Sequence, residues 1–188
     1  ATFIDREEEL RKFYESKDAI AVGPGIGTGS TGQEMVIDLI ENFEGPLVID
    51  ADGLDQLQSI LPLIRNRTKP MIITPHPGEM AKLIDSSPDK VNRNRVETAE
   101  KFARENGIYV VLKGPCTVVA TPDEETFIND TGNAGLAKGG SGDVLTGMIL
   151  AFIARYENVQ HAVSTAVFMH GFTADYMLVH GTAIEAMT

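Results

Sequence analysis

The chain has 188 residues, 43% of them hydrophobic and 23% charged, with a net charge of −11. This composition is ordinary for one globular domain and unlike that of a disordered chain. The negative charge argues against nucleic acid or an anionic membrane as the main partner. Residues 1–17 are too charged for a signal peptide, and no apolar run approaches the ~20 residues of a spanning helix, so we expect a cytoplasmic protein. The single cysteine, Cys116, provides neither a disulfide nor a zinc cluster, and we expect a small buried thiol there.

Short β-rich runs alternate with helical patterns along the chain. The strands are expected at Ala19–Val22, Pro46–Asp50, Met71–Thr74 and Ile108–Lys113, and the helices at Gly32–Phe43, Gly53–Ile60, Gly78–Ile84 and Asn92–Asn106. This alternation indicates βαβ crossovers, and hence an α/β fold with a mostly parallel central sheet flanked by helices. Val118–Ala120 and Phe127–Asn129 favour an antiparallel hairpin at one edge, and helices at Val144–Arg155 and Val163–Leu178 complete a single domain, 1–188.

Unusual residues follow each of the four predicted parallel strands. They are the glycine-rich run Gly23–Gly32, the acidic run Ile49–Gly53 with Asp50 and Asp52, the run Thr74–Glu79 with His76, and the run Lys113–Thr117. Taken singly, such residues are most often turn, cap or surface residues. Because ligands bind beyond the carboxyl ends of parallel strands, four such ends together predict a binding site at that edge.

A further glycine-rich turn precedes the first of the two last helices. Val144, Leu145, Met148, Ile149 and Phe152 have helical spacing, so Gly139 to Gly142 lead into the unpaired N–H groups of a helix start. Those groups and the helix dipole attract anions such as phosphate. Asp143 would repel a phosphate there unless it takes a proton from an attacking hydroxyl. The alternative is an aspartate that caps a helix after a flexible loop.

Four other classes of protein compete with this interpretation. Gly27 to Gly32 fit the GxGxxG pattern after a strand, and Asp50 lies at about the right distance to bind a ribose in a Rossmann oxidoreductase. That hypothesis leaves the 139–143 turn, His76 and Lys113 without roles. A P-loop is excluded because no Gly-Lys-Ser/Thr occurs, and neither GxSxG nor HExxH is present.

Five motifs in order, GPGIG, IDADGL, TPHPGE, LKGPCT and NAGLAKGGSGDVLTG, run from residue 23 to residue 147. In this combination and spacing the chain resembles the NAD(P)H-hydrate dehydratase family, whose fold is ribokinase-like. Residues 166–175 also resemble the family's last long helix. The resemblance implies an enzyme that repairs nicotinamide cofactors by dehydrating hydrated NADH or NADPH at the expense of a nucleotide. The KGxxT and NxGxAxGGxGD forms resemble the branch that uses ADP rather than ATP.

The resemblance also implies roles for individual residues. Asp143 would contact the substrate and act as the base that deprotonates its ring hydroxyl. Gly25 and His76 would bind the hydrated dinucleotide, with Asp52 as a weaker neighbour, and Glu79 would organise Mg²⁺ through water. The adenine nucleotide would be held by Lys113, Gly114, Pro115, Cys116, Thr117, Asn133, Gly139, Gly140 and Gly142. Members of the family are commonly homo-oligomers.

The chain departs from the family pattern at its ends. Family members normally begin with a further Gly/Ala-rich segment and continue a little beyond the residues matching 183–188, so we expect a domain that is partial at its N-terminus. Two other functions stay open. One is a ribokinase-superfamily kinase for a vitamin-precursor alcohol, which would use the same base and glycine turn but release a phosphate ester. The other is a nucleotide-binding subunit without catalysis.

Overall fold

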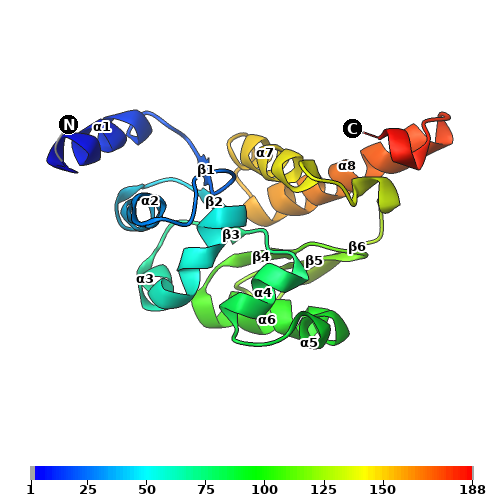
Figure 1. The fold of residues 1–188 in the computed structure, drawn as a ribbon, viewed down its shortest axis with the longest axis horizontal. Coiled ribbons are helices and arrows are strands. Elements are labelled where there is room, and N and C mark those ends of the chain that lie inside the picture. The colour runs from blue at the N-terminus through cyan, green and yellow to red at the C-terminus, as the bar shows by residue number, and fades with distance from the viewer. Residues whose placement is uncertain (1–2, 188) are drawn as a thin grey trace.

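The computed structural model describes residues 3–187, which form a six-stranded sheet with helices on both faces (Figure 1). Residues 1, 2 and 188 of the predicted domain lie outside the described residues. The strands lie side by side in chain order: β1 (Ile20–Val22), β2 (Leu47–Ile49), β3 (Met71–Ile73), β4 (Tyr109–Leu112), β5 (Thr117–Ala120) and β6 (Thr126–Asn129). β1 to β4 are parallel, whereas β4, β5 and β6 pair antiparallel. The predicted mostly parallel sheet with an antiparallel hairpin at one edge is confirmed.

The central strands are apolar throughout because both faces of the sheet are covered. Side chains alternate between the faces, so in β2 Leu47 and Ile49 join one buried cluster and Val48 joins the other. β3 repeats this alternation, with Met71 and Ile73 on one face and Ile72 on the other. The sheet thus separates two hydrophobic cores. Because both faces are buried and apolar, the strand ends are where polar functional groups can lie.

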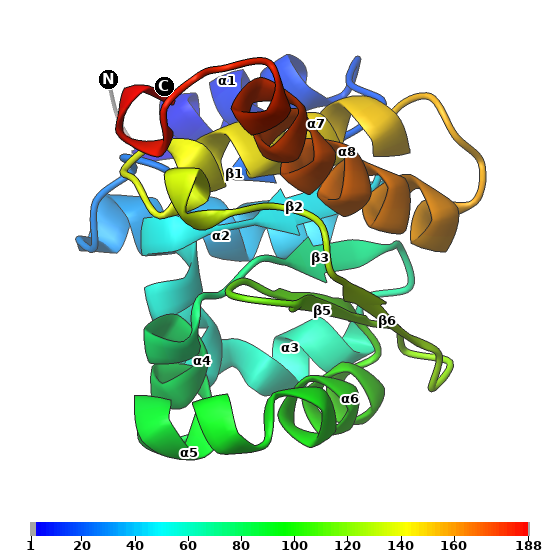
Figure 2. The ribbon, with the colours of Figure 1, turned by 90° about the vertical axis from the view of Figure 1, so that its right-hand side faces the viewer.

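The helices divide between these two cores. α7 (Ser141–Ile153) and α8 (Val159–Val179) pack together on one face, as Figure 2 shows. The other face is covered by α2 (Ser30–Asn42), the 3₁₀ helix η1 (Ala51–Ile60), α3 (Leu61–Asn66), α4 (Pro77–Leu83), α5 (Pro88–Arg93) and α6 (Arg95–Asn106). The remaining elements are α1 (Phe3–Tyr14) and two short 3₁₀ turns, η2 (Ala134–Leu136) and η3 (Ile184–Ala186). Within the described range, no helix combines the length and apolar character needed to cross a bilayer.

Several predicted helix boundaries were wrong. The helix expected at 53–60 is a 3₁₀ helix that begins at Ala51, where φ is +49°, and α3 continues from it. The helix expected at 92–106 is broken at Asn94, whose φ of −129° and ψ of 45° end α5 before α6 begins. α8 begins four residues early because the Asn158 side chain accepts a hydrogen bond from the His161 N–H, 2.8 Å away. The sequence interpretation missed α1, α3 and α5.

The strand order excludes the Rossmann alternative. In that fold the first strand lies inside the sheet, between strands 2 and 4. Here β1 is the first strand at one edge, and its parallel neighbours follow in chain order. Asp50, which that hypothesis assigned to a ribose, is only 1% exposed and is therefore closed to a sugar.

Two helical glycines provide a matched test of packing between α8 and the loop after β6. A Cβ at Gly171 would lie 2.3 Å from the Thr131 Oγ1 atom, whereas a Cβ at Gly147 in α7 meets nothing within 4 Å. Alanine normally stabilises a helix relative to glycine by about 0.5–1 kcal/mol. We expect Gly147→Ala to raise the free energy of unfolding by that amount, and Gly171→Ala to lower it by about 2 kcal/mol through overpacking. Urea denaturation measures both, and two changes of the same sign would contradict the contact.

Candidate active site

A buried ion pair joins the ends of β2 and β4 to the first helix after the glycine turn. Lys113 Nζ lies 2.7 Å from Asp50 Oδ1, and Thr146 Oγ1 of α7 donates to Asp50 Oδ2 at 2.7 Å. Lys113 Nζ also lies 3.9 Å from Glu79 Oε2. The structure therefore brings together residues from three of the strand ends that the sequence analysis singled out, with Asp50 at their centre.

The environment of Asp50 determines its protonation. Burial alone would raise the pKa of the carboxyl, but the charge and hydrogen bond of Lys113 and the hydrogen bond from Thr146 outweigh burial and lower it. Asp50 is thus an anion in the folded protein at neutral pH, and Lys113 lies against it.

This lowered pKa predicts a pH dependence of stability. A group whose pKa is lower in the folded state stabilises the protein above its unfolded value, here 3.8, and loses this contribution as the pH falls through the folded value. We expect the difference in free energy of unfolding between the wild type and Asp50→Asn to shrink as the pH falls below 3.8. Urea denaturation at closely spaced pH values from about 5 downward, where such a contribution begins to be lost, measures it. A difference that stays constant over this range would contradict the lowered pKa.

His76 and Glu79 form a capping box at the start of α4. The His76 Nδ1 atom accepts hydrogen bonds from the N–H groups of Gly78 and Glu79 at 3.0 and 3.2 Å. Glu79 Oε2 accepts from the His76 N–H at 2.7 Å, and Glu79 Oε1 lies 3.4 Å from His76 Nε2. Since Nδ1 is an acceptor, the neutral ring carries its proton on Nε2. The imidazole is thereby fixed in orientation, while 57% of its side chain remains exposed to a ligand.

Asp52 fixes the glycine-rich loop after β1. Its Oδ2 atom accepts a hydrogen bond from the Gly27 N–H at 3.0 Å, so the start of η1 ties this loop to the end of β2. Gly25 lies in the same loop with a φ of +72° and open space around its Cα. The predicted substrate residues Gly25 and Asp52 are therefore linked, because Asp52 of η1 orders the backbone of the loop that contains Gly25.

The Lys113–Thr117 loop is held by a residue that the sequence interpretation missed. Arg95 of α6 donates to the backbone oxygens of Leu112 and Lys113 at 2.8 and 3.3 Å. It also donates to the Cys116 oxygen at 3.5 Å. Cys116 is exposed and has a φ of +51°, so the expectation of a buried thiol was wrong. The reason is that Cys116 lies in the turn between β4 and β5 rather than in a strand.

A second missed residue, Asp175 of α8, fixes the loop around Asn133. Its two carboxylate oxygens accept hydrogen bonds from the Gly132 N–H at 2.7 Å and from Asn133 Nδ2 at 3.0 Å. Asn133 Oδ1 in turn accepts from the Gly135 N–H and begins η2. The only sequence signal was the position of Asp175 in the last helical segment, about forty residues beyond the loop that it orders.

The predicted glycine turn is shorter than the sequence suggested. Ser141 and Gly142 already belong to α7, and Gly140 precedes them with a φ of +88°. An added Cβ at Gly142 would lie 3.3 Å from Lys113 Nζ, so the ammonium group lies against the first turn of the helix. Asp143 is an exposed residue of the same turn.

A pocket of 780 Å³ opens between these loops and the two helices. Among the predicted residues it is lined by His76, Lys113, Gly114, Pro115, Cys116, Thr117, Asn133 and Gly142. Its lining does not include Gly25, Asp52, Glu79, Gly139, Gly140 or Asp143. The predicted nucleotide residues thus largely share one cavity, whereas most of the predicted substrate residues lie outside it.

His170 of α8 is a further lining residue without a sequence prediction. Its Nε2 atom lies 3.4 Å from Ser141 Oγ, at the start of α7. Burial lowers the pKa of the imidazole, so the ring is neutral near pH 7. Leu145 and Val167 line the pocket beside it, which makes this wall largely apolar.

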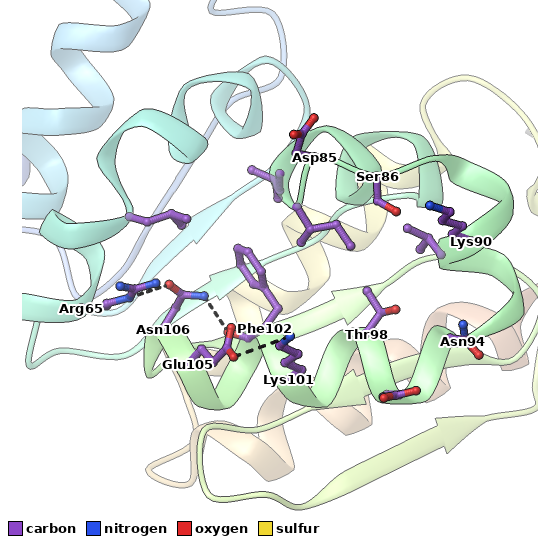
Figure 3. Close-up of a pocket in the computed structure, with 15 residues that line it drawn as sticks. Arg65, Asp85, Ser86, Lys90, Asn94, Thr98, Lys101, Phe102, Glu105 and Asn106 are labelled. Carbon is purple, nitrogen blue, oxygen red and sulfur yellow. Dashed lines mark hydrogen bonds and ion pairs between the residues drawn. The ribbon is translucent and has the colours of Figure 1, made fainter.

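A second hollow, of 520 Å³, lies on the α3–α6 side of the sheet (Figure 3). Arg65 donates to Asn106 Oδ1 there at 3.1 Å, and Lys101 pairs with Glu105 at 4.0 Å. None of the predicted site residues lines it. With these polar groups already paired and no cluster of reactive groups, this hollow does not compete with the strand ends as the active site.

Comparison with known proteins shows the family of the chain. A family described as Carb_kinase, NAD(P)H-hydrate dehydratase, matches residues 4–187. The bifunctional NAD(P)H-hydrate repair enzyme Nnr of Thermofilum pendens is 41% identical over 168 residues, which are 89% of this chain and 32% of that protein. The ADP-dependent (S)-NAD(P)H-hydrate dehydratase of Bacillus subtilis is 39% identical over 161 residues, which are 86% of this chain and 56% of that protein.

The fold of the chain is also similar to that of solved structures of this family. The crystal structure of the ADP/ATP-dependent NAD(P)H-hydrate dehydratase from Bacillus subtilis, co-crystallized with ATP/Mg²⁺, aligns with a TM-score of 0.82 and 33% identity. The alignment covers 95% of this chain and 64% of that chain, so the sequence spans less than two thirds of these relatives. The family match nevertheless extends over nearly the whole chain, and the fold aligns with that of the Bacillus subtilis enzyme. The chain belongs to the NAD(P)H-hydrate dehydratase family.

Proposed function

We propose that this protein dehydrates hydrated NADH and NADPH back to the working cofactors, with ADP as the co-substrate. It would then be a lyase of metabolite repair. The observation that carries the proposal is the position of Lys113, whose ammonium group lies between the buried Asp50 carboxylate and the first turn of α7. The Bacillus subtilis relative, which is named an ADP-dependent (S)-NAD(P)H-hydrate dehydratase, supports the choice of reaction and of nucleotide.

The pocket suits an adenine nucleotide in charge and polarity. Leu145 and Val167 offer an apolar wall for the base, while Lys113 and the N–H groups at the start of α7 offer positive potential for phosphates. Asn133 and the 114–117 loop would contact the rest of the nucleotide. Gly139, Gly140 and Gly142 would bring backbone donors close to the transferred phosphoryl group, a term worth about 3 kcal/mol per donor in comparable oxyanion sites.

Asp143 would start the reaction by taking the proton of the C6 hydroxyl of the hydrated ring. The hydroxyl oxygen attacks the β-phosphorus of ADP, the bond from that phosphorus to the bridging oxygen breaks, and AMP leaves. The ring nitrogen then expels phosphate from C6, and loss of the C5 proton restores the dihydronicotinamide. The sum is hydrated NADH plus ADP giving NADH, AMP and phosphate. Gly25, Asp52 and His76 would position the hydrated ring.

Magnesium would accompany the nucleotide. Among residues 3–187, no group of three or more His, Cys, Asp or Glu side chains is arranged to bind a metal. Mg²⁺ usually keeps several waters and takes one or two carboxylates plus substrate phosphates. Glu79 could supply such a carboxylate through water, because its remaining lone pairs are not used by the capping box. The ion would neutralise phosphate charge.

Location and assembly stay predictions. A cytoplasmic location would match the site of the cofactor pool that such an enzyme repairs. Homo-oligomer formation would cover apolar surface such as the exposed rings of Phe168, Phe172 and Tyr176, which follow one another along α8. Sedimentation velocity would measure the assembly.

The decisive experiment mixes the protein with hydrated NADH, Mg²⁺ and either ADP or ATP, and follows the recovery of the dihydronicotinamide absorbance. Recovery with ADP, with AMP and phosphate in equal amounts, is the expected result. Nucleotide binding by calorimetry without recovery would contradict the proposal. A stable phosphate ester detected by ³¹P NMR would instead favour the kinase alternative.

The two roles of His76 can be separated by a pair of variants. His76→Ala removes both the exposed ring and the cap of α4, whereas His76→Asn removes the ring and keeps a side chain that caps well. We expect both to raise the KM for the hydrated dinucleotide about tenfold, as for one lost polar contact, with a smaller change for ADP. Only His76→Ala should also lose about 1 kcal/mol of stability. Equal effects on both substrates would contradict the placement of His76.

A further inference from the structure

Among the residues whose burial the structure describes, Asp50 is the one buried carboxylate at the strand ends, and the proposed chemistry gives it no role. It follows β2 directly and is 1% exposed. A buried carboxylate is costly unless it is paired and hydrogen-bonded. Both of its oxygens are used, and each by a different element of the site.

The first carboxylate oxygen of Asp50 pairs with Lys113 and fixes the position of its ammonium group. Asp50 Oδ1 lies 2.7 Å from Lys113 Nζ, whereas the nearest Glu79 oxygen is 3.9 Å from the same atom. Lysine has a long, flexible stem, so an ammonium group occupies one place only where a partner fixes it. Asp50 is the closer of these two anions, and it is the more deeply buried.

The second carboxylate oxygen of Asp50 binds α7 through the Thr146 hydroxyl. Asp50 Oδ2 accepts a hydrogen bond from the Thr146 hydroxyl at 2.7 Å, and Thr146 itself is buried. Thr146 lies one helical turn beyond Gly142, whose Cα faces the Lys113 ammonium group. One carboxylate therefore fixes both the lysine and the helix turn that lies against it.

We infer that Asp50 is a positioning residue, which sets the Lys113 ammonium group against the first turn of α7 so that both meet the phosphates of the adenine nucleotide together. The inference rests on the proposed function for its reaction. The Asp50 carboxylate acts through Lys113 and through the helix, without touching the nucleotide. Donors fixed before the reaction stabilise developing charge without reorganisation, and small misplacements of such groups are costly to the rate.

A double-mutant cycle tests the inference, with Asp50→Asn, Lys113→Met and the double variant. We expect Asp50→Asn to lower kcat about tenfold or more, with a smaller change in the KM for hydrated NADH. If Asp50 acts in part through Lys113, Asp50→Asn should cost less turnover in the Lys113→Met background, where only the Thr146 link remains to be lost, than in the wild type. A multiplicative loss in the double variant would overturn the inference, because a general structural role lowers activity in either background.

The same four proteins give a second double-mutant cycle, in which the dissociation constant for ADP is measured by calorimetry. This cycle does not depend on enzymatic turnover. The same non-additivity is expected: both single variants bind ADP more weakly, and the loss in the double variant is smaller than the product of the two single losses. If the wild type binds ADP but never restores NADH, the proposed function fails while this cycle still decides the role of Asp50. Independent effects on binding would overturn the inference.

Thr146 provides variants that leave the ion pair intact if Asp50→Asn does not fold. Thr146→Ser keeps the hydroxyl that Asp50 accepts, and Thr146→Val removes it with little change in shape. We expect Thr146→Ser to keep near-wild-type kcat and Thr146→Val to lose several-fold, with both variants folded by circular dichroism. Equal kcat values for the two folded variants would overturn the link between Asp50 and α7.

Discussion

Replacing Asp143 with asparagine is expected to reduce turnover by two or more orders of magnitude, as for the loss of a general base. The change keeps the shape of the side chain and removes its ability to take a proton. Since Asp143 is exposed in the first turn of α7, the fold does not depend on it, and the loss of a favourable helix-dipole interaction costs about 0.3–1 kcal/mol. ADP binding, measured by calorimetry, should therefore be largely retained.

A matched control is available in α5. Asp89 is also an exposed acidic residue in the first turn of a helix, on the opposite face of the sheet. Asp89→Asn should change stability as little as Asp143→Asn does and leave turnover unchanged. Near-normal turnover in Asp143→Asn would remove this carboxylate from the mechanism.

Gly23→Ala is expected to produce the largest loss of stability. The φ of Gly23 is +135°, and an added Cβ would lie 1.7 Å from the backbone oxygen of Asp50. Only backbone atoms are in the way, so no side chain can rotate to relieve the clash. The end of β1 or of β2 would have to move, and we expect the free energy of unfolding to fall by about 3–5 kcal/mol.

The loss should extend to function, because Asp50 holds Lys113 at the same place. Gly27→Ala is the control: its φ of +76° also disfavours alanine, but nothing lies within 4 Å of the added Cβ. The left-handed conformation alone costs roughly 1–2 kcal/mol. Urea denaturation of both variants separates conformation from close contact, and equal losses would contradict the contact between β1 and β2.

The regular elements could be predicted because they have local causes. Apolar runs bounded by glycine and proline marked all four parallel strands, and the hairpin of β5 and β6 followed from its polar turn. α1 and α5 were missed because their sequences are strongly charged and their apolar positions are few. The break at Asn94 was missed because a helical pattern continues through it, while the backbone there turns away from helical geometry.

The candidate site was predictable to the extent that it lies in contiguous motifs. Lys113 to Thr117, Asn133 and Gly142 line one pocket, as runs of glycine, proline and polar residues at strand and helix ends suggested. Arg95, His170 and Asp175 were not predictable, because each lies in a helix far along the chain from the loop or residue that it contacts. Their residue types and local sequence resemble those of ordinary helix residues.

The sequence by itself determined the α/β class, the motifs and their family, because these depend on periodicity and on residue types at fixed spacing. Only the tertiary structure decided what the isolated residues do. Asp50 was a turn residue in the sequence, and folding buried it between Lys113 and Thr146, which lie 63 and 96 residues further along the chain. Such long-range pairs form when the strand ends pack against α7. The local sequence around a carboxylate therefore does not indicate which ammonium group will pair with it.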